Sequence, residues 1–139
     1  VYGSGQKRGF FGSLVKELVL NPSLGKPGRV THSDAMIGWS YVDDPARATV
    51  MASKAKTNKT RSYSIMGDVR SVKDVVEYVK KILPNADITC LPGTFTGDPV
   101  KLDTNLIEEE IGYIPEWSME QGIKETINIT RKQNGLAII

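Results

Sequence analysis

Apolar residues recur three and four positions apart in several stretches of the chain, which is the spacing that places them on one face of a helix. The first stretch ends at Asn21-Pro22, because proline cannot continue a regular helical ladder. The pattern predicts five helices, at about residues 10–20, 43–55, 71–83, 104–111 and 118–132.

Three of these helices begin with residues that suit a helix N-terminus. Ser71 is followed three residues later by Asp74, and Ser118 is followed at the same spacing by Gln121, as in capping boxes. Asp43-Asp44-Pro45 combines carboxylates that can cap free N–H groups with a proline suited to the first helical position. We therefore interpret the two aspartates as helix caps and not as a carboxylate pair for acid–base catalysis.

Short runs of strand-forming residues alternate with the helices, near residues 1–3, 29–32, 38–41, 62–66 and 87–90. Tyr2 leads directly into Gly3-Ser4-Gly5, so the chain begins with the end of a strand and a turn. The 139 residues, 40% of them apolar, predict a single α/β domain that spans residues 1–139.

Charge and composition narrow the range of functions. Eighteen basic and sixteen acidic residues are interspersed along the chain, so no basic stripe for nucleic acid or a membrane surface is expected. The chain has no apolar run near the about 20 residues of a membrane-spanning helix and no signal pattern. Cys90 is the only cysteine, which excludes an internal disulfide and favours a buried structural thiol. We expect a soluble cytoplasmic protein.

Gly3, Gly5 and Gly9 are spaced like the glycines of a dinucleotide-binding turn. That motif also needs a complete strand before it and an acidic ribose-binding residue after a second strand, about 20 residues later. Here the helix is followed by a loop over residues 21–25. We reject the motif on this ground.

Four segments, VYGSGQ, WSYVDDPARA, SYSIMGDVRSVKDVVEYVKKIL and EEEIGYIPEWSMEQGIKETI, together resemble the C-terminal half of the extended short-chain dehydrogenases, the family of NAD-dependent epimerases and dehydratases. They occur in that family's order and approximate spacing. The resemblance implies an incomplete Rossmann-type fragment, the C-terminal substrate-binding part, with the N-terminal NAD-binding Rossmann domain absent from this chain.

Members of this family bind NAD or NADP on that N-terminal domain and use a tyrosine with a lysine four residues later. None of the five tyrosines here has such a lysine; the residues at those positions are Gln6, Pro45, Gly67, Ile82 and Trp117. The resemblance thus implies the substrate-binding portion of an NAD(P)-dependent sugar-nucleotide epimerase or dehydratase. We expect no catalytic residue, no metal and no bound cofactor in this chain alone.

By resemblance, the segments from Gln6 to Phe10 and from Arg29 to Trp39 line the substrate pocket. The candidate substrate contacts are Gln6, Lys7, Arg8, Phe10, Arg29, His32 and Trp39. Tyr2 is a candidate contact for the cofactor. The basic residues suit a pyrophosphate, His32 a sugar or phosphate, and Trp39 a base. Lys7 and Arg8 as solvated surface, His32 as a polar loop residue and Trp39 as core remain open alternatives.

The sequence departs from the family pattern at both positions where an arginine often holds phosphate. Ile37 occupies the first, and the stretch Leu91 to Pro99 lacks the second. Two alternatives remain within the family. Other basic groups, such as Arg29 or Lys101, hold a sugar nucleotide, or the chain belongs to a reductase-like relative that acts on a smaller substrate. A non-enzymatic ligand-binding or regulatory module is a further alternative. We also expect self-association through exposed apolar surface, because a chain that begins inside a strand leaves backbone unpaired.

Overall fold

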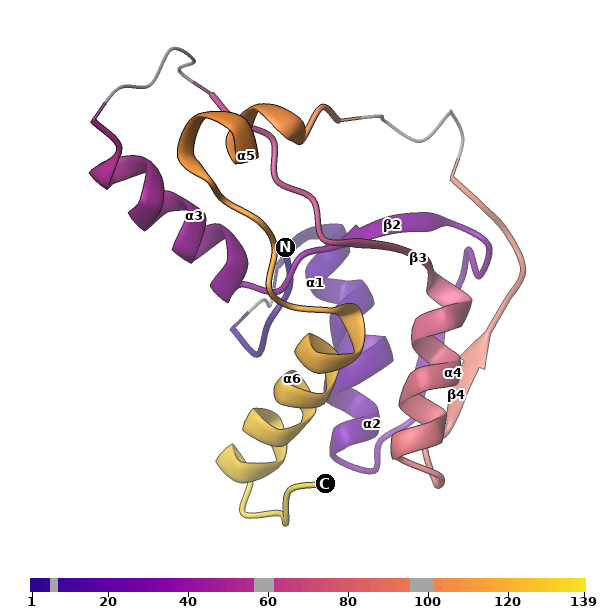
Figure 1. The fold of residues 1–139 in the computed structure, drawn as a ribbon. Coiled ribbons are helices and arrows are strands. Elements are labelled where there is room, and N and C mark those ends of the chain that lie inside the picture. The colour runs from indigo at the N-terminus through magenta and orange to yellow at the C-terminus, as the bar shows by residue number, and fades with distance from the viewer. Residues whose placement is uncertain (6–7, 57–61, 96–101) are drawn as a thin grey trace.

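The computed structural model describes residues 1–5, 8–56, 62–95 and 102–139 (Figure 1). Over these residues the order of elements is α1 (Gly9–Val15), η1 (Lys16–Leu20), α2 (Asn21–Ser23), β1 (Gly28–Val30), β2 (Met36–Trp39), α3 (Asp43–Lys54), β3 (Asp68–Ser71), α4 (Val72–Ile82), β4 (Ile88–Cys90), α5 (Asn105–Ile111) and α6 (Met119–Gln133). Because α1, η1 and α2 are continuous, the described chain has five helical segments, as predicted. The α/β class is confirmed.

The first helical segment extends beyond its predicted end. It continues through Asn21-Pro22 to Ser23, after a π-helical turn, η1. The backbone N–H of Asn21 bonds the carbonyl of Lys16 in the wider π pattern, directly before Pro22, which has no N–H to donate. The prediction that Asn21-Pro22 ends the helix was therefore wrong by one turn.

The strands form two separate two-stranded sheets. β1 and β4 are parallel, with Gly28 opposite Ile88, whereas β2 and β3 are antiparallel, with Trp39 opposite Asp68. Tyr2 adds a single parallel bridge to Tyr41. The extended segments predicted near residues 1–3, 29–32, 38–41 and 87–90 each contain one of these pairings.

The strand predicted at 62–66 was wrong, since the paired strand is β3 at Asp68–Ser71. Gly67 explains the displacement. A Cβ on Gly67 would lie 2.1 Å from the carbonyl oxygen of Trp39, so only glycine allows the chain to enter alongside β2. The Gly67 N–H donates to the hydroxyl oxygen of Ser40 at 2.8 Å, and regular pairing begins at the next residue.

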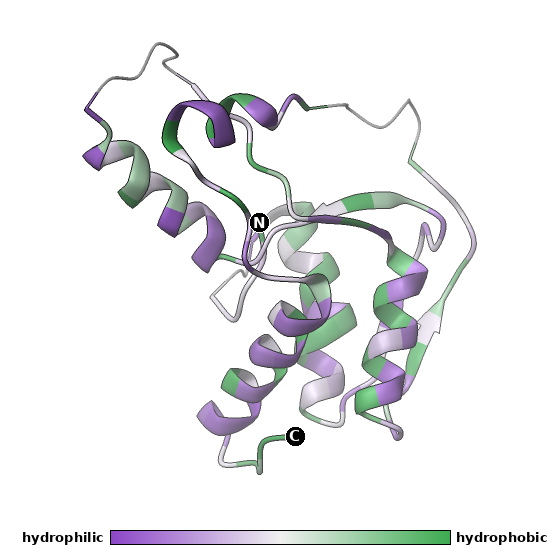
Figure 2. Cartoon of the chain, in the orientation of Figure 1, coloured by the Kyte–Doolittle hydropathy of each residue, from purple (hydrophilic) through white to green (hydrophobic). Residues whose placement is uncertain are grey.

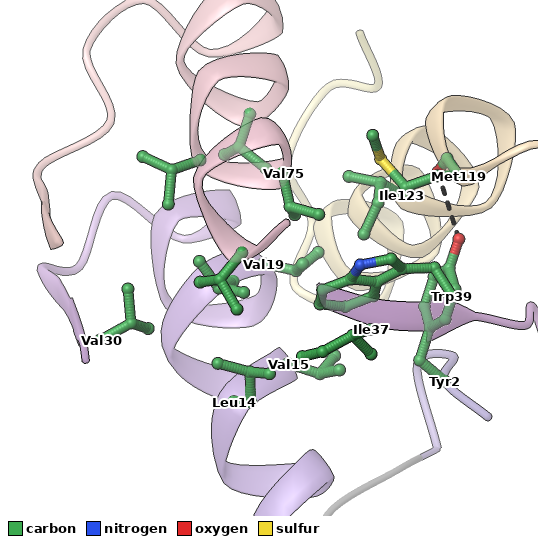
Figure 3. Close-up of a cluster of buried hydrophobic side chains, with 14 of the residues drawn as sticks. Tyr2, Leu14, Val15, Val19, Val30, Ile37, Trp39, Val75, Met119 and Ile123 are labelled. Carbon is green, nitrogen blue, oxygen red and sulfur yellow. Dashed lines mark hydrogen bonds between the residues drawn. The ribbon is translucent and has the colours of Figure 1, made fainter. Parts of the chain in front are cut away.

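The main hydrophobic core lies between the first helical segment, α4, α6 and the inner side of β2 (Figure 3). Val15, Val19, Val75 and Ile123 are fully buried members of this core, and Trp39 is 2% exposed within it. Figure 2 shows the outward side of α6 as hydrophilic. Burial of side chains of this size stabilises a fold by about 1.5–3 kcal/mol each, so this core holds the three helical segments together.

A second, smaller core joins α3 and α5, which lie apart from the main helical body in Figure 1. Its buried members are Ala48, Ile107 and Tyr113, and Tyr63 and Ile65 pack against them. The segment 62–66, predicted as a strand, thus contributes side chains to this core.

The two serine capping boxes are confirmed, but the aspartate cap is not. Ser71 with Asp74 and Ser118 with Gln121 each form both reciprocal hydrogen bonds. At α3 the N-cap residue is Val42, and no side chain caps the helix. The carboxylate of Asp44 turns instead to the connector between α5 and α6.

Candidate functional site

Aromatic side chains from three separate parts of the chain meet at one end of the β1–β4 sheet. The ring of His32 stacks on Phe95, with centroids 5.1 Å apart and an interplanar angle of 26°. Phe10 approaches Phe95 edge to face at 5.2 Å and 77°, and Phe11 extends the row at 5.5 Å from Phe10. We call Phe10, Phe11, His32 and Phe95 the aromatic cluster.

The parallel pairing of β1 with β4 produces this meeting. Parallel strands end at the same edge of a sheet, so the residues that follow Val30 and Cys90 leave the sheet side by side. Phe10, in the first turn of α1, then meets Phe95. Loops beyond the carboxyl ends of parallel strands are common sites of ligand binding in α/β proteins.

Backbone hydrogen bonds hold the two loops together. Ser33 N–H donates to the carbonyl of Leu91 (3.1 Å), and Asp34 N–H donates to the carbonyl of Gly93 (2.9 Å). The Asp34 carboxylate in turn accepts from Gly93 N–H at 3.2 Å. His32 and Phe95 are therefore positioned by a network of bonds and not by ring contact alone.

His32 has a left-handed backbone, with φ 66°, and it is the only non-glycine residue with positive φ in the described part of the chain. Histidine tolerates this conformation better than most residues, but such positions store strain and concentrate at functional sites. Its Nδ1 atom shares a hydrogen bond with the Thr31 hydroxyl, 2.7 Å away. Among the described residues, the hydrogen bond of the imidazole is the one at Nδ1.

The structure brings together two of the predicted substrate contacts, Phe10 and His32. Phe95, which joins them, was missed, although it lies in the Leu91 to Pro99 stretch that departs from the family pattern. Arg8 is exposed directly before α1. Arg29 is exposed on β1, with its backbone N–H donating to Glu17 Oε2 at 3.0 Å. Gln6, Lys7 and Lys101 lie outside the described residues.

Tyr2 and Trp39 lie in the main core and not in the aromatic cluster. Trp39 is 2% exposed, and its indole N–H donates to the carbonyl of Arg70 at 3.2 Å. The Tyr2 hydroxyl donates to the carbonyl of Met119 at 3.1 Å (Figure 3). Ile37 is also buried in this core. Trp39 is therefore a core residue, which was one of its two predicted roles. Contact of Trp39 with substrate, or of Tyr2 with cofactor, stays a prediction.

All five tyrosines are described, and none is disposed to act as a base at neutral pH. Burial is the main cause that raises the pKa values of Tyr2, Tyr41, Tyr78 and Tyr113. For Tyr63 the main cause is the hydrogen bond that its hydroxyl donates to Glu110 at 2.7 Å. A tyrosine that takes up protons in catalysis needs the opposite shift, toward the working pH.

The described residues provide neither an activated thiol nor a cluster of metal-binding side chains. The Cys90 thiol is half-buried, and desolvation raises its pKa, so it is protonated and weakly nucleophilic at neutral pH. Within the described ranges, histidine, cysteine and carboxylate side chains form no group of three or more that could hold a metal ion. No helix among these residues has the length and apolarity needed to cross a membrane.

The fold formed by these elements is that of part of the NAD-dependent epimerases of the short-chain dehydrogenase type. Solved structures similar to the chain include UDP-glucuronic acid 4-epimerase of Bacillus cereus with UDP-glucuronic acid and NAD (22% identity, 95% of this chain, 43% of that chain, TM-score 0.72). Others are UDP-glucose 4-epimerase of Thermotoga maritima with UDP-glucose (22%, 96%, 44%, 0.71) and L-threonine dehydrogenase of Cupriavidus necator (17%, 88%, 48%, 0.69).

The chain spans less than half the length of each of these three proteins. At such sequence identities the likeness establishes the fold. No protein-family model and no curated protein sequence matches the chain.

Proposed function

We propose that this chain is the substrate-binding portion of an NAD- or NADP-dependent sugar-nucleotide epimerase or dehydratase. The supporting observation is that two UDP-sugar 4-epimerases with bound UDP-sugars match 95% and 96% of this chain, with TM-scores of 0.72 and 0.71. The aromatic cluster is the part of the described surface best suited to receive the substrate, since it combines apolar rings with a hydrogen-bonding imidazole.

The described residues do not fit a cradle for the NAD pyrophosphate. A Cβ on Gly3 would meet the Val42 side chain at 2.9 Å, so packing within the chain already explains this glycine. Gly9 has a left-handed φ of 73°, so the turn before the helix already explains this glycine, and Gly5 has no atom within 4 Å of the place of a Cβ. We therefore assign cofactor binding and the tyrosine–lysine pair to the Rossmann domain of the intact enzyme, and substrate binding to this chain.

A reductase-like relative with a smaller substrate is a second candidate. Ile37, at the position where an arginine often holds phosphate, is buried, and the candidate site consists largely of uncharged rings. L-threonine dehydrogenases among the similar solved structures support this alternative. A non-enzymatic ligand-binding module is the third possibility, and in either enzymatic case we propose a cytoplasmic location, which suits the single free cysteine.

Calorimetric titration of this chain with NAD, UDP-glucose and UDP tests the main proposal. Binding of UDP-glucose without binding of NAD is the expected result. Binding of NAD would contradict the assignment of the cofactor to another domain. Binding of neither nucleotide would contradict a sugar-nucleotide site in this chain and favour the smaller substrate.

We also propose that the chain self-associates through exposed apolar surface. Phe10, Val50 and Ile114 are among the large apolar residues that are about half exposed or more in the described structure. Exposed apolar groups gain free energy when they are removed from water, so association should grow with concentration. A monomer at all concentrations in sedimentation equilibrium would contradict this proposal.

A further inference from the structure

The C-terminal end of α6 is closed by a Schellman motif, in which two backbone N–H groups beyond the helix return to carbonyls of its last turn. Gly135 has a left-handed φ of 70°, and its N–H donates to the carbonyl of Lys132 at 3.2 Å. The N–H of Leu136 donates to the carbonyl of Arg131 at 2.9 Å. This motif sets the direction in which the chain leaves α6.

Beyond the motif, residues 136–139 fold back along α6 and are held by two of its side chains (Figure 1). The Asn128 amide accepts from the N–H of Ile139 at 2.9 Å and donates to the main-chain oxygen of the same residue at 3.3 Å. Arg131 donates through Nε to the carbonyl of Ala137 at 2.5 Å. Ile139 also packs against the main core. We call residues 136–139 the C-terminal strap.

The residue pair that joins α6 to the strap is chemically reactive. The chain has six asparagines, and only Asn134 is followed by glycine. The main-chain nitrogen of Gly135 can attack the side-chain Cγ of Asn134, because a glycine has no side chain to hinder the approach. A carbon–nitrogen bond forms, the side-chain amide leaves as ammonia with the proton of the attacking nitrogen, and a succinimide ring results. Water then opens either carbonyl of this ring and gives aspartate or its β-linked isomer.

The fold restrains both reacting groups. The Asn134 amide points back along the helix and donates to the carbonyl of Thr130 at 2.8 Å, while the N–H of Gly135 is bonded to Lys132. Both bonds must break, and the side chain must turn toward Gly135, before the nitrogen reaches Cγ. Asn134 and Gly135 are exposed at the end of a helix, where local opening costs least. The reaction therefore proceeds from molecules in which this end has opened.

We propose that Asn134 is a site of spontaneous deamidation, and that the carboxylate produced there releases the C-terminal strap from α6. A carboxylate has no hydrogen to donate to the carbonyl of Thr130. Its negative charge lies at a helix C-terminus, where the helix dipole disfavours anions. It also lies three residues after Arg131 on the same helix, so it competes for the guanidinium that holds Ala137.

Mass spectrometry of tryptic peptides tests the reaction after incubation of the chain at mildly alkaline pH, with and without urea. Peptides 133–139 and 125–131 report separately on Asn134 and Asn128. Asn128 is the internal control, because the β-branched side chain of Ile129 crowds the nitrogen that would attack. In urea we expect conversion in peptide 133–139 and not in peptide 125–131. Without urea it should be about tenfold slower, since the hydrogen bonds of the reacting groups must break first.

The variant Gly135→Ala tests the attacking nitrogen. It is compared with the unchanged chain in urea, where the strain of a side chain at positive φ has no influence. The added methyl group should slow the conversion of Asn134, because it crowds the approach to Cγ. An unchanged rate would show that the ring closure assumed here is not the route of the reaction.

The variant Asn134→Asp reproduces the aspartyl product and tests release of the strap. Hydrogen exchange at the amide of Ile139, which bonds Asn128, should become about tenfold faster, because a hydrogen bond is lost and an unfavourable charge is added at the helix end. Asn134→Ala removes the amide without adding charge and should have a smaller effect. Asn105→Asp, the same change at an exposed residue of α5, is the control and should leave this exchange unchanged.

Three further results would overturn the proposal. One is conversion in peptide 133–139 that is no faster in urea than conversion in peptide 125–131, because Asn134 would then have no special reactivity. Another is an equal rate with and without urea, which would show that the fold does not restrain the reacting groups. The third is unchanged exchange at Ile139 in Asn134→Asp, because the strap would then stay bound after the modification.

Discussion

Replacement of Asp44 should destabilise the protein more than any other single change of a charged residue described above. Its carboxylate is 1% exposed and accepts hydrogen bonds from the backbone N–H groups of Glu116 (2.9 Å) and Trp117 (3.2 Å). Arg47 lies 3.8 Å from the same carboxylate and forms an ion pair of 3.2 Å with Glu116. Asp44 thus fastens the start of α3 to the connector that leads into α6.

The magnitude follows from the groups that the change leaves unpaired. In Asp44→Ala two part-buried backbone N–H groups lose a charged acceptor, and a hydrogen bond to a charged group contributes about 1.5–3 kcal/mol. Because water can reach the exposed Glu116 and replace part of this loss, a decrease of about 2–4 kcal/mol in the free energy of unfolding is expected. Asp44→Asn keeps one acceptor oxygen but turns an NH₂ group toward the second N–H, so a loss of about 2 kcal/mol is expected.

Urea unfolding followed by circular dichroism measures both variants. The matched control is Asp43→Asn, because Asp43 is the neighbouring carboxylate and is exposed; it should change the unfolding free energy by less than about 0.5 kcal/mol. Equal stabilities of the Asp43 and Asp44 variants, within that margin, would refute the role of Asp44 as a clamp. They would also restore helix capping as the simpler interpretation of this residue pair.

Three further predictions concern close packing and ionisation. Gly122→Ala should destabilise by about 1–3 kcal/mol in urea unfolding, because its Cβ would lie 2.1 Å from the Tyr2 hydroxyl oxygen, whereas Gly5→Ala, with no atom within 4 Å, should be close to neutral. Hydrogen bonds from Ser71 lower the pKa of Asp74 below its ordinary value of 3.8. The stability that the ionised carboxylate contributes is therefore complete above pH 3.8 and should be lost as the pH falls through the lower pKa of the folded state. Asp74→Asn should reduce this dependence of the unfolding free energy on pH. The five tyrosines should ionise above 10 in the folded chain and near 10 in urea, as followed by tyrosinate absorbance; a tyrosine that ionises below 10 in the folded chain would contradict the assignment of catalysis to another domain.

Local signals in the sequence predicted most of the helices and their starts. The capping boxes of Ser71 and Ser118 use residues only three positions apart, so the sequence contains both partners and their spacing. The resemblance to extended short-chain dehydrogenases led to the correct fold because it depends on the order of several segments and not on one motif. The candidate site was predicted in part, since Phe10 and His32 both contact Phe95, whereas Tyr2 and Trp39 lie in the core.

Two of the failures, at β3 and at Asp44, share a physical cause, which is that the deciding contact joins residues far apart in the chain. The start of β3 depends on how closely Gly67 approaches Trp39, and no periodicity in residues 62–71 contains that distance. The Asp43-Asp44-Pro45 segment has every local feature of a capped helix, yet the partners of Asp44 lie 72 and 73 residues away. Tertiary contacts override local preference here, because a buried carboxylate must find donors wherever the fold supplies them.

By itself the sequence determined the α/β class, the helical segments and the resemblance to one family of dehydrogenases and epimerases, because apolar periodicity and end-capping act over a few residues. Only the tertiary structure decided which strands pair, where the Asp44 carboxylate binds and which rings meet. The aromatic cluster exists because β1 and β4 run parallel and release their loops at one edge. That pairing joins segments 60 residues apart, from Gly28 to Ile88, and is selected by the packing of the helices that cover it.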